Sequence, residues 1–214
     1  PILKTTAPNI VNYIDRNKIL QDIRSAQARR PDAIIAYMHW GEEYRSLPNR
    51  EQRELTDWLL QQGVTHIIGS HPHVIQPMEL RNNGHQQHVV VYSLGNFISN
   101  MQAPNTDGGL IFTLQLEKYP LPKPIPPRYL NQSHAPSLDS STISFPYCRV
   151  SNCGYNFVWT ARPTLTGEKN FILYPVNHSM DSLPQNAHNR LRIFTENSRK
   201  LLQQYNVDIH EKKK

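Results

Sequence analysis

Residues 33–73 have the sequence AIIAYMHWGEEYRSLPNREQRELTDWLLQQGVTHIIGSHPH, and this stretch decides the fold. It holds two short apolar runs, Ala33–Met38 and Thr65–Ile68, which we expect to form β-strands. The first run alternates poorly, which favours a strand covered on both faces. Between the runs, Asn49 and Gln52 have the spacing of a capping box, and Gly63 suits a helix end. The stretch therefore predicts a strand–helix–strand unit.

This unit brings three histidines to one edge of the predicted sheet. Its two strands should be parallel and joined by a right-handed crossover, so their carboxyl ends share an edge, where open α/β sheets bind ligands. His39 directly follows the first strand, and His71 and His73 flank Pro72 after the second. Neutral imidazole is a common ligand for transition metals. We therefore expect the three side chains to lie within reach of a common ion.

Further elements are expected on both sides of this unit. Asp15–Arg30 has a cap and an apolar stripe that predict a helix, and Pro31 ends it. The run His88–Tyr92 predicts a third strand, which Pro77–Leu80 can join as a hairpin through the turn at 82–84. Leu110–Leu116 alternates like a half-buried strand at a sheet edge.

The remainder of the chain changes character after Lys118. Six prolines between Tyr119 and Ser137 predict an extended connector. Beyond it we expect strands at 157–160 and 171–174 and a helix at 187–205, with an apolar face made of Leu191, Phe194, Leu201, Leu202 and Tyr205. We divide the chain into a first unit of residues 1–118, a connector of residues 119–154 and an extension of residues 155–214 that packs back on the first unit. Cys148 and Cys153 could form a small-loop disulfide or stay as two free thiols.

Composition narrows the class of protein. The 214 residues are enough for one sizeable domain, and a formal net charge of +6 suits an anionic partner. We expect no nucleic-acid partner, because no basic stripe is interleaved with aromatic residues, and no membrane span, because no apolar run is long enough. The chain begins with Pro1 and shows no signal peptide, so we expect a processed protein or a fragment, and the sequence leaves the compartment open.

Three motifs carry a resemblance to a known family. They are H-W-G-E-E-Y at 39–44, G-S-H-P-H-V-I-Q-P-M-E at 69–79 and Y-S-L-G-N-F at 92–97. In this order and spacing they resemble the second half of the CapA family, which is linked to capsule and poly-γ-glutamate synthesis. The resemblance covers about residues 32–116. It implies a cell-envelope role and an α/β fold, namely part of a layered α/β sandwich like that of the calcineurin-like metallophosphoesterases.

The resemblance also implies a metal site and a reaction. His39 and His71 would serve one divalent ion and His73 a second, the ions being Mn, Fe or Zn, and these three histidines would be the catalytic residues. The remaining ligands would come from aspartates and an asparagine in an N-terminal half that this chain does not contain. A complete site of this kind would hydrolyse a phosphoester by two-metal catalysis.

Four residues near the histidines are candidate substrate-binding residues: Glu42, Glu43, Arg45 and Glu79. The two neighbouring glutamates could also orient His39 or be solvated loop acids, and the arginine could bind phosphate or carboxylate. We expect Asn96 to serve a structural turn and Trp40 to belong to the core or to the wall of the site.

Three functions remain open from the sequence. The first is a metal-dependent hydrolase that resembles a phosphoesterase and acts on a small molecule or an anionic polymer. The second is a non-catalytic envelope protein that binds or assembles an anionic polymer, alone or with other capsule-synthesis proteins. The third is a fragment with no activity of its own.

Overall fold

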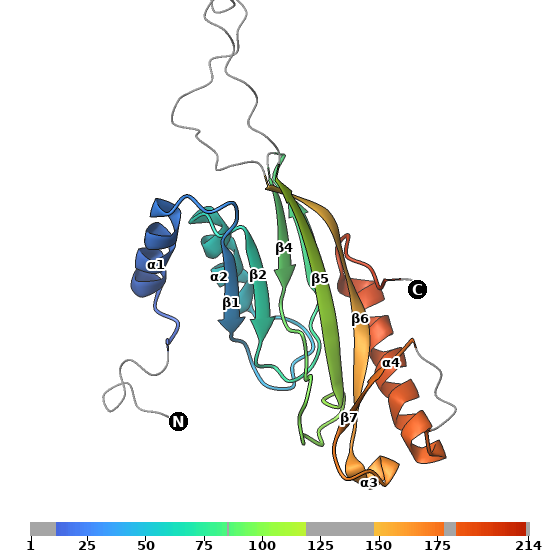
Figure 1. Cartoon of the computed structure of the whole chain (residues 1–214). Helices are drawn as coiled ribbons and strands as arrows, with labels where there is room; N and C mark the ends of the chain where they lie inside the picture. Colours follow the sequence, from blue (N-terminus) through green and yellow to red (C-terminus); the bar gives the residue numbers. More distant parts are fainter. Residues whose placement is uncertain (1–11, 85, 119–147, 178–182, 213–214) are drawn as a thin grey trace, which may run out of the picture.

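The computed structural model describes residues 12–84, 86–118, 148–177 and 183–212, which form a mixed α/β structure with two sheets (Figure 1). The first sheet has the strand order β1-β2-β4-β3 and the second β5-β6-β7. The elements, in chain order, are α1 (Arg16–Ala28), β1 (Ile35–His39), α2 (Arg50–Gln61), β2 (His66–Ser70), β3 (Met78–Asn82), β4 (Gln87–Val91), β5 (Gly108–Lys118), β6 (Cys148–Ala161), α3 (Pro163–Thr166), β7 (Ile172–Pro175) and α4 (Gln185–Tyr205).

The first sheet contains the predicted strand–helix–strand unit. β1 pairs with β2 in parallel, β2 pairs with β4 in parallel, and β3 and β4 form the expected antiparallel hairpin. Helix α2 starts at the predicted capping box, in which the Asn49 side chain accepts from the backbone N–H of Gln52 and the Gln52 side chain accepts from that of Asn49. Two orphan donors of the first turn are thereby paired, so the helix start is defined locally.

One face of the first sheet is covered by the two N-terminal helices. Met38, Ile67 and Val90, from three adjacent strands, pack there with Leu55 and Leu59 of α2. This core holds β1 and β2 side by side and fixes where their carboxyl ends lie.

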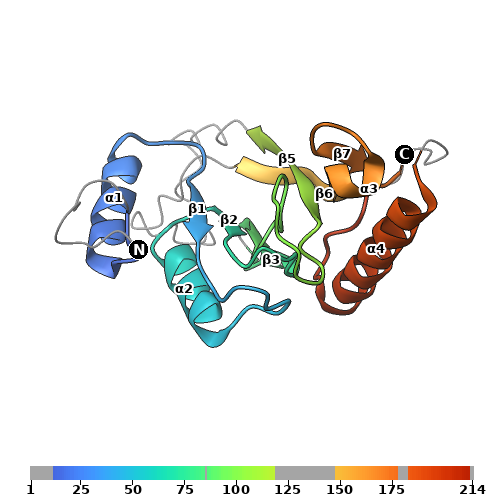
Figure 2. The same ribbon diagram turned by 90° about the horizontal axis from the view of Figure 1, so that it is seen from below.

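The opposite face of the first sheet packs under the second sheet, but only over part of its width. Val89 and Val91 of β4 are fully buried in the same core as Trp159 and Phe157 of β6. Figure 2 shows the second sheet on one side of the molecule, with the first sheet and α4 beneath it. The second sheet therefore covers the β4 side of the first sheet and leaves the β1 side open.

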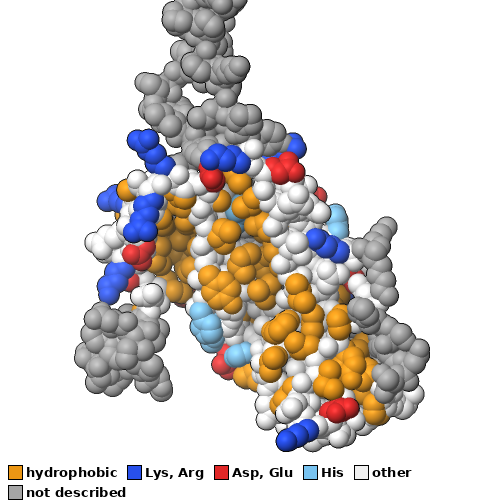
Figure 3. Space-filling view, in the orientation of Figure 1, with side chains coloured by type: hydrophobic (Ala, Val, Ile, Leu, Met, Phe, Trp, Pro, Cys, Tyr) orange, Lys and Arg blue, Asp and Glu red, His pale blue; other side chains and the backbone are white. Residues whose placement is uncertain are grey.

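The β1 strand is consequently not covered on both faces, and that prediction was wrong. Ile35 is 52% exposed and Tyr37 67% exposed, because β1 is an edge strand beyond the reach of the second sheet. Figure 3 shows apolar side chains gathered on this side of the molecule, over β1, β2 and β5. The poor alternation of the run reflects apolar residues on an open face, which local sequence does not distinguish from a buried one.

Strand β6 of the second sheet begins earlier in the chain than the sequence suggested. β6 starts at Cys148, so residues 148–154 are strand and not connector, and β5 pairs with β6 over its whole length. The sheet thus joins the first unit directly to the extension. Both cysteines are free thiols. The predicted connector at 119–147 lies outside the described residues.

Helix α4 closes the core of the second sheet. Its buried face consists of Ala187, Leu191, Phe194, Thr195, Ser198 and Leu202. Tyr205, which we expected on this face, is 42% exposed at the last position of the helix, where its phenol can stay in water. In the described part of the chain, neither α4 nor any other helix is long and apolar enough to cross a membrane.

Candidate metal site

The three predicted histidines lie together at the carboxyl edge of the first sheet. His39 is the last residue of β1, and His71 and His73 follow the end of β2. The ring centroids of His39 and His71 are 4.6 Å apart, and those of His71 and His73 are 6.0 Å apart. The parallel pairing of β1 with β2 produces this cluster, as the strand–helix–strand reading predicted.

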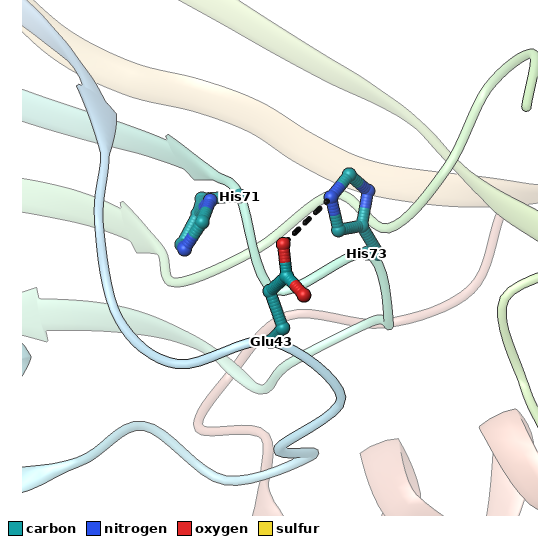
Figure 4. A group of neighbouring side chains, drawn as sticks. All are labelled: Glu43, His71 and His73. Atoms are coloured by element: carbon teal, nitrogen blue, oxygen red, sulfur yellow. Dashed lines mark ion pairs between the residues drawn. The ribbon is translucent and has the colours of Figure 1, made fainter. Parts of the chain in front are cut away.

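Glu43 joins two of these histidines. One ligand atom each from Glu43, His71 and His73 lie within 4.8 Å of one another, and the Glu43 carboxylate points between the two rings (Figure 4). The Oε1 atom of Glu43 is 3.8 Å from Nε2 of His73. We call these three residues the triad.

The triad fits a divalent metal ion. Metal–ligand bonds of about 2.0 to 2.2 Å place neighbouring ligand atoms of a tetrahedral ion about 3.3 Å apart, so small side-chain movements would close the triad around one ion. Two imidazoles and a carboxylate suit Zn, Mn or Fe. A three-ligand set also leaves coordination positions for water or substrate.

The surroundings of His71 favour the form of imidazole that binds metal. Partial burial lowers the pKa of His71, the neighbouring His39 and His73 lower it further, and the carboxylate of Glu43 acts in the opposite direction. A lowered pKa keeps the ring neutral and its lone pair available at neutral pH.

The backbone around the triad adopts uncommon conformations. His71 has φ of +105°, His73 of +61° and Tyr44 of +65°, a region that residues other than glycine rarely occupy. Such conformations persist only where the surroundings impose them. Here the Tyr44 N–H donates to the carbonyl of Pro72 at 2.8 Å, which ties the loop that carries Glu43 to the histidine turn.

Two buried glutamines secure the same loop from behind. The Gln76 side-chain NH₂ donates to the carbonyl of Arg45 at 2.8 Å, and the Gln52 NH₂ donates to Oε1 of Gln76 at 2.9 Å. Gln52 is 2% exposed and Gln76 is fully buried. This glutamine pair connects helix α2, the histidine turn and the Glu43 loop, and we did not predict it.

The three sequence motifs meet beside the site. The Trp40 indole N–H donates to the carbonyl of Tyr92 at 2.9 Å, and it does so directly across Gly69. A Cβ atom on Gly69 would lie 2.1 Å from the Tyr92 carbonyl oxygen and 2.5 Å from the indole nitrogen, so only glycine fits. Trp40 is buried, as expected for a residue of the core or wall.

Asn96 contacts the triad, although we had expected it only in a turn. Its Oδ1 atom is 2.9 Å from Nδ1 of His73, and its NH₂ group donates to the carbonyl of Thr106 at 2.9 Å. The signal that could have found this contact is topological. β4 runs parallel to β2, so the segment after β4 arrives at the same sheet edge as His73.

The other candidate residues stay outside the triad. Arg45 lies 3.6 Å from Glu42, and both side chains are exposed. Glu79 pairs with Arg81 at 2.5 Å, and Arg81 also binds Asp57 of α2. Burial acts to lower the pKa of Arg81, but the hydrogen bonds to Asp57 and Glu79 outweigh burial and raise it.

In the assignment that the resemblance implied, His39 and His71 would share one ion and His73 would serve another, and this assignment stays a prediction. In the structure, ligand atoms of His71 and His73 lie close to a carboxylate oxygen of Glu43. The ring of His39 lies beside that of His71, tilted at 53°, next to the triad. Glu43, a candidate for substrate binding in the sequence, thus lies within reach of the atoms of His71 and His73.

Comparison with known proteins shows which proteins the first part of the chain resembles. Residues 3–101 match the family model of the bacterial capsule synthesis protein PGA_cap. The chain is 34% identical over 94 residues to the PGA biosynthesis protein CapA of Bacillus subtilis, which covers 44% of this chain and 24% of that protein. It is 37% identical over 67 residues to the capsule biosynthesis protein CapA of Bacillus anthracis, which covers 31% and 15% of the two chains.

The matched stretch contains the triad, the glutamine pair and Asn96. The alignments with the two relatives span 24% and 15% of their lengths, and no solved structure matches the chain significantly. Through residues 3–101, the chain is similar to the bacterial capsule synthesis protein PGA_cap and to the CapA proteins of two Bacillus species.

Proposed function

We propose that this chain acts in capsule or poly-γ-glutamate biosynthesis in the cell envelope as part of a metal-dependent hydrolase that resembles a phosphoesterase. The observation that carries the proposal is the triad, which gathers two imidazoles and a carboxylate at a sheet edge. Its substrate would be a small phosphoester or an anionic polymer.

The residues of the site would have different roles in metal and substrate binding. Glu43, His71 and His73 would hold a divalent ion, and His39, whose ring centroid is 4.6 Å from that of His71, could serve a second ion. When bound, such an ion supplies a water of lowered pKa and polarises a phosphoryl oxygen. Arg45, exposed beside the loop, could contact an anionic group of the substrate.

Metal binding tests this proposal directly. The natural chain should bind Zn²⁺ or Mn²⁺ in calorimetry. Loss of a residue that only hydrogen-bonds to a metal ligand typically weakens metal binding by about 10–100-fold. His71→Ala removes a ligand and should weaken metal binding by more than this. The control is His210→Ala, because His210 is exposed and belongs to the segment after α4. Equal metal affinity in the natural chain and in His71→Ala would refute the triad as the site.

We further propose that another part of the CapA domain completes the site. The edge strands support this, because β1 and β5 each lie at the end of a sheet, and Ile35 and Tyr37 of β1 are exposed apolar residues. Ile34 and Trp40 hydrogen-bond toward β2, so by the two-residue period the backbone groups of Ile35, Tyr37 and His39 point to the open edge. An open apolar edge strand is a template for strand addition.

The completing part would lie next to the metal site. Figure 3 shows histidine and acidic side chains at the lower end of the exposed apolar face, so a segment packed there would also contact the triad edge. Co-expression with the portion of Bacillus subtilis CapA outside the matched stretch should yield a complex that co-purifies with this chain. Independent elution of the two polypeptides would argue against completion by such a segment.

The positive net charge of the chain favours a second function, the binding of an anionic polymer without catalysis. The formal net charge of +6 suits an anionic polymer, which the chain could bind or assemble without catalysis. Binding of poly-γ-glutamate that persists in a chelator and in His71→Ala would favour this function over the hydrolase.

A further inference from the structure

We infer that Asn96 is a positioning residue, which fixes the tautomer of His73 so that Nε2 faces Glu43 and a metal ion. The purpose of this device rests on the proposed metal function. The tautomer itself is a property of the metal-free chain and can be observed separately.

The hydrogen-bond network leaves one assignment for the Asn96 amide. The carbonyl of Thr106 can only accept, so the atom of Asn96 that lies 2.9 Å from it must be the NH₂ group. The other end of the amide, Oδ1, therefore faces His73. Asn96 is 7% exposed, and its backbone N–H donates to the carbonyl of Gly108 at 3.0 Å, so the residue is held at both ends.

The assignment of Asn96 determines the proton position on His73. Because Oδ1 can only accept, Nδ1 of His73 must carry the proton that is shared over 2.9 Å. A neutral imidazole has a single N–H, so Nε2 keeps its lone pair. This is the nitrogen that lies 3.8 Å from Glu43 Oε1.

Fixing this ring matters because the turn alone does not orient it. A free neutral imidazole populates both tautomers, and rotation of the ring would exchange the nitrogen offered to the metal. Within the described residues, His73 is the one member of the histidine cluster with a hydrogen bond to its ring. An outer hydrogen bond of this type orients a metal-ligating histidine and raises its basicity.

Nuclear magnetic resonance of the histidine ring nitrogens tests the inference without metal. In the metal-free natural chain near pH 8.5, the His73 signals, assigned by their loss in His73→Ala, should show a protonated Nδ1 and an unprotonated Nε2. In Asn96→Ala the ring should become a mixture or switch to the Nε2–H tautomer. Asn96→Asp keeps an acceptor for Nδ1–H and should retain the natural tautomer.

Metal affinity provides the second readout. Asn96→Ala should lower Zn²⁺ affinity by about 10–100-fold, and Asn96→Asp should recover most of it. An Nε2–H tautomer in the natural chain would overturn the inference even if no variant folds, and so would unchanged tautomer and affinity in Asn96→Ala. If the natural tautomer is present and lost in Asn96→Ala, but the natural chain binds no metal, the positioning contact stands and the proposed metal function falls.

Discussion

His66 should make the stability of the fold fall sharply in mild acid. The side chain is fully buried, its Nδ1 accepts the N–H of Val89 at 3.0 Å, and its Nε2–H has no partner among the described residues. Burial, with a further effect of His88, lowers its pKa from 6.5 to about 4. Between pH 6.5 and about 4, His66 is therefore protonated in the unfolded chain and mostly neutral in the folded chain.

The sign and size follow from proton linkage. Above pH 6.5 the residue is neutral in both states and has no effect. As pH falls from 6.5 to about 4, only the unfolded chain gains the proton, so stability is lost across this window. At about 1.4 kcal/mol per pH unit, the loss attributable to His66 is about 2 kcal/mol at pH 5 and about 3 kcal/mol at pH 4.

Urea unfolding, followed by tryptophan fluorescence between pH 8 and 4, measures this loss. His66→Asn retains an acceptor for the Val89 N–H but does not titrate, so its stability should fall less steeply than that of the natural chain, by the amounts above. The smaller side chain should lower the stability of this variant at pH 8. The test compares how the unfolding free energy changes with pH, so this constant difference does not affect it. The control is His210→Asn at an exposed position. Parallel pH curves for the natural chain and His66→Asn would refute the reasoning.

Two further substitutions test the contact between motifs and the open face. Gly69→Ala should destabilise the chain by about 2 kcal/mol or more, because its Cβ would clash with Tyr92 and Trp40. The control is Gly84→Ala, whose Cβ meets nothing within 4 Å and which should cost only about 1 kcal/mol for its positive φ. Equal urea midpoints of the two variants would contradict the steric argument. Tyr37→Lys should change stability by less than about 0.5 kcal/mol because the side chain is exposed, yet abolish co-purification with the other part of CapA; a retained complex would place the contact elsewhere.

The elements that local signals specify could be predicted from the sequence. The capping box at Asn49 and Gln52 and the apolar runs on either side of α2 define the strand–helix–strand unit within about thirty-five residues, and the parallel pairing then brings His39 to the other histidines. The hairpin of β3 and β4 has an equally local cause, because Gly84 at φ of +87° suits the tight turn.

The features that depend on distant segments could not be predicted in this way. The exposure of Tyr37 follows from where the second sheet lies, and the start of β6 at Cys148 follows from pairing with β5, whose end is thirty residues earlier in the chain. Glu43 reaches the histidines because its loop is tied to Pro72, and Asn96 reaches His73 because β4 ends at the same edge. Residue type alone carries none of this information.

The two buried glutamines have a consequence for the conditions under which the site keeps its shape. Gln52 and Gln76 hold the Arg45 carbonyl through uncharged amides, which neither titrate nor lose strength when salt screens charges. The exposed pair of Arg45 and Glu42, in the same loop, weakens as ionic strength rises. The loop therefore has a salt-sensitive outer surface and a salt-insensitive inner anchor, so variation in ionic strength should alter how charged molecules approach Glu43 without moving Glu43 itself.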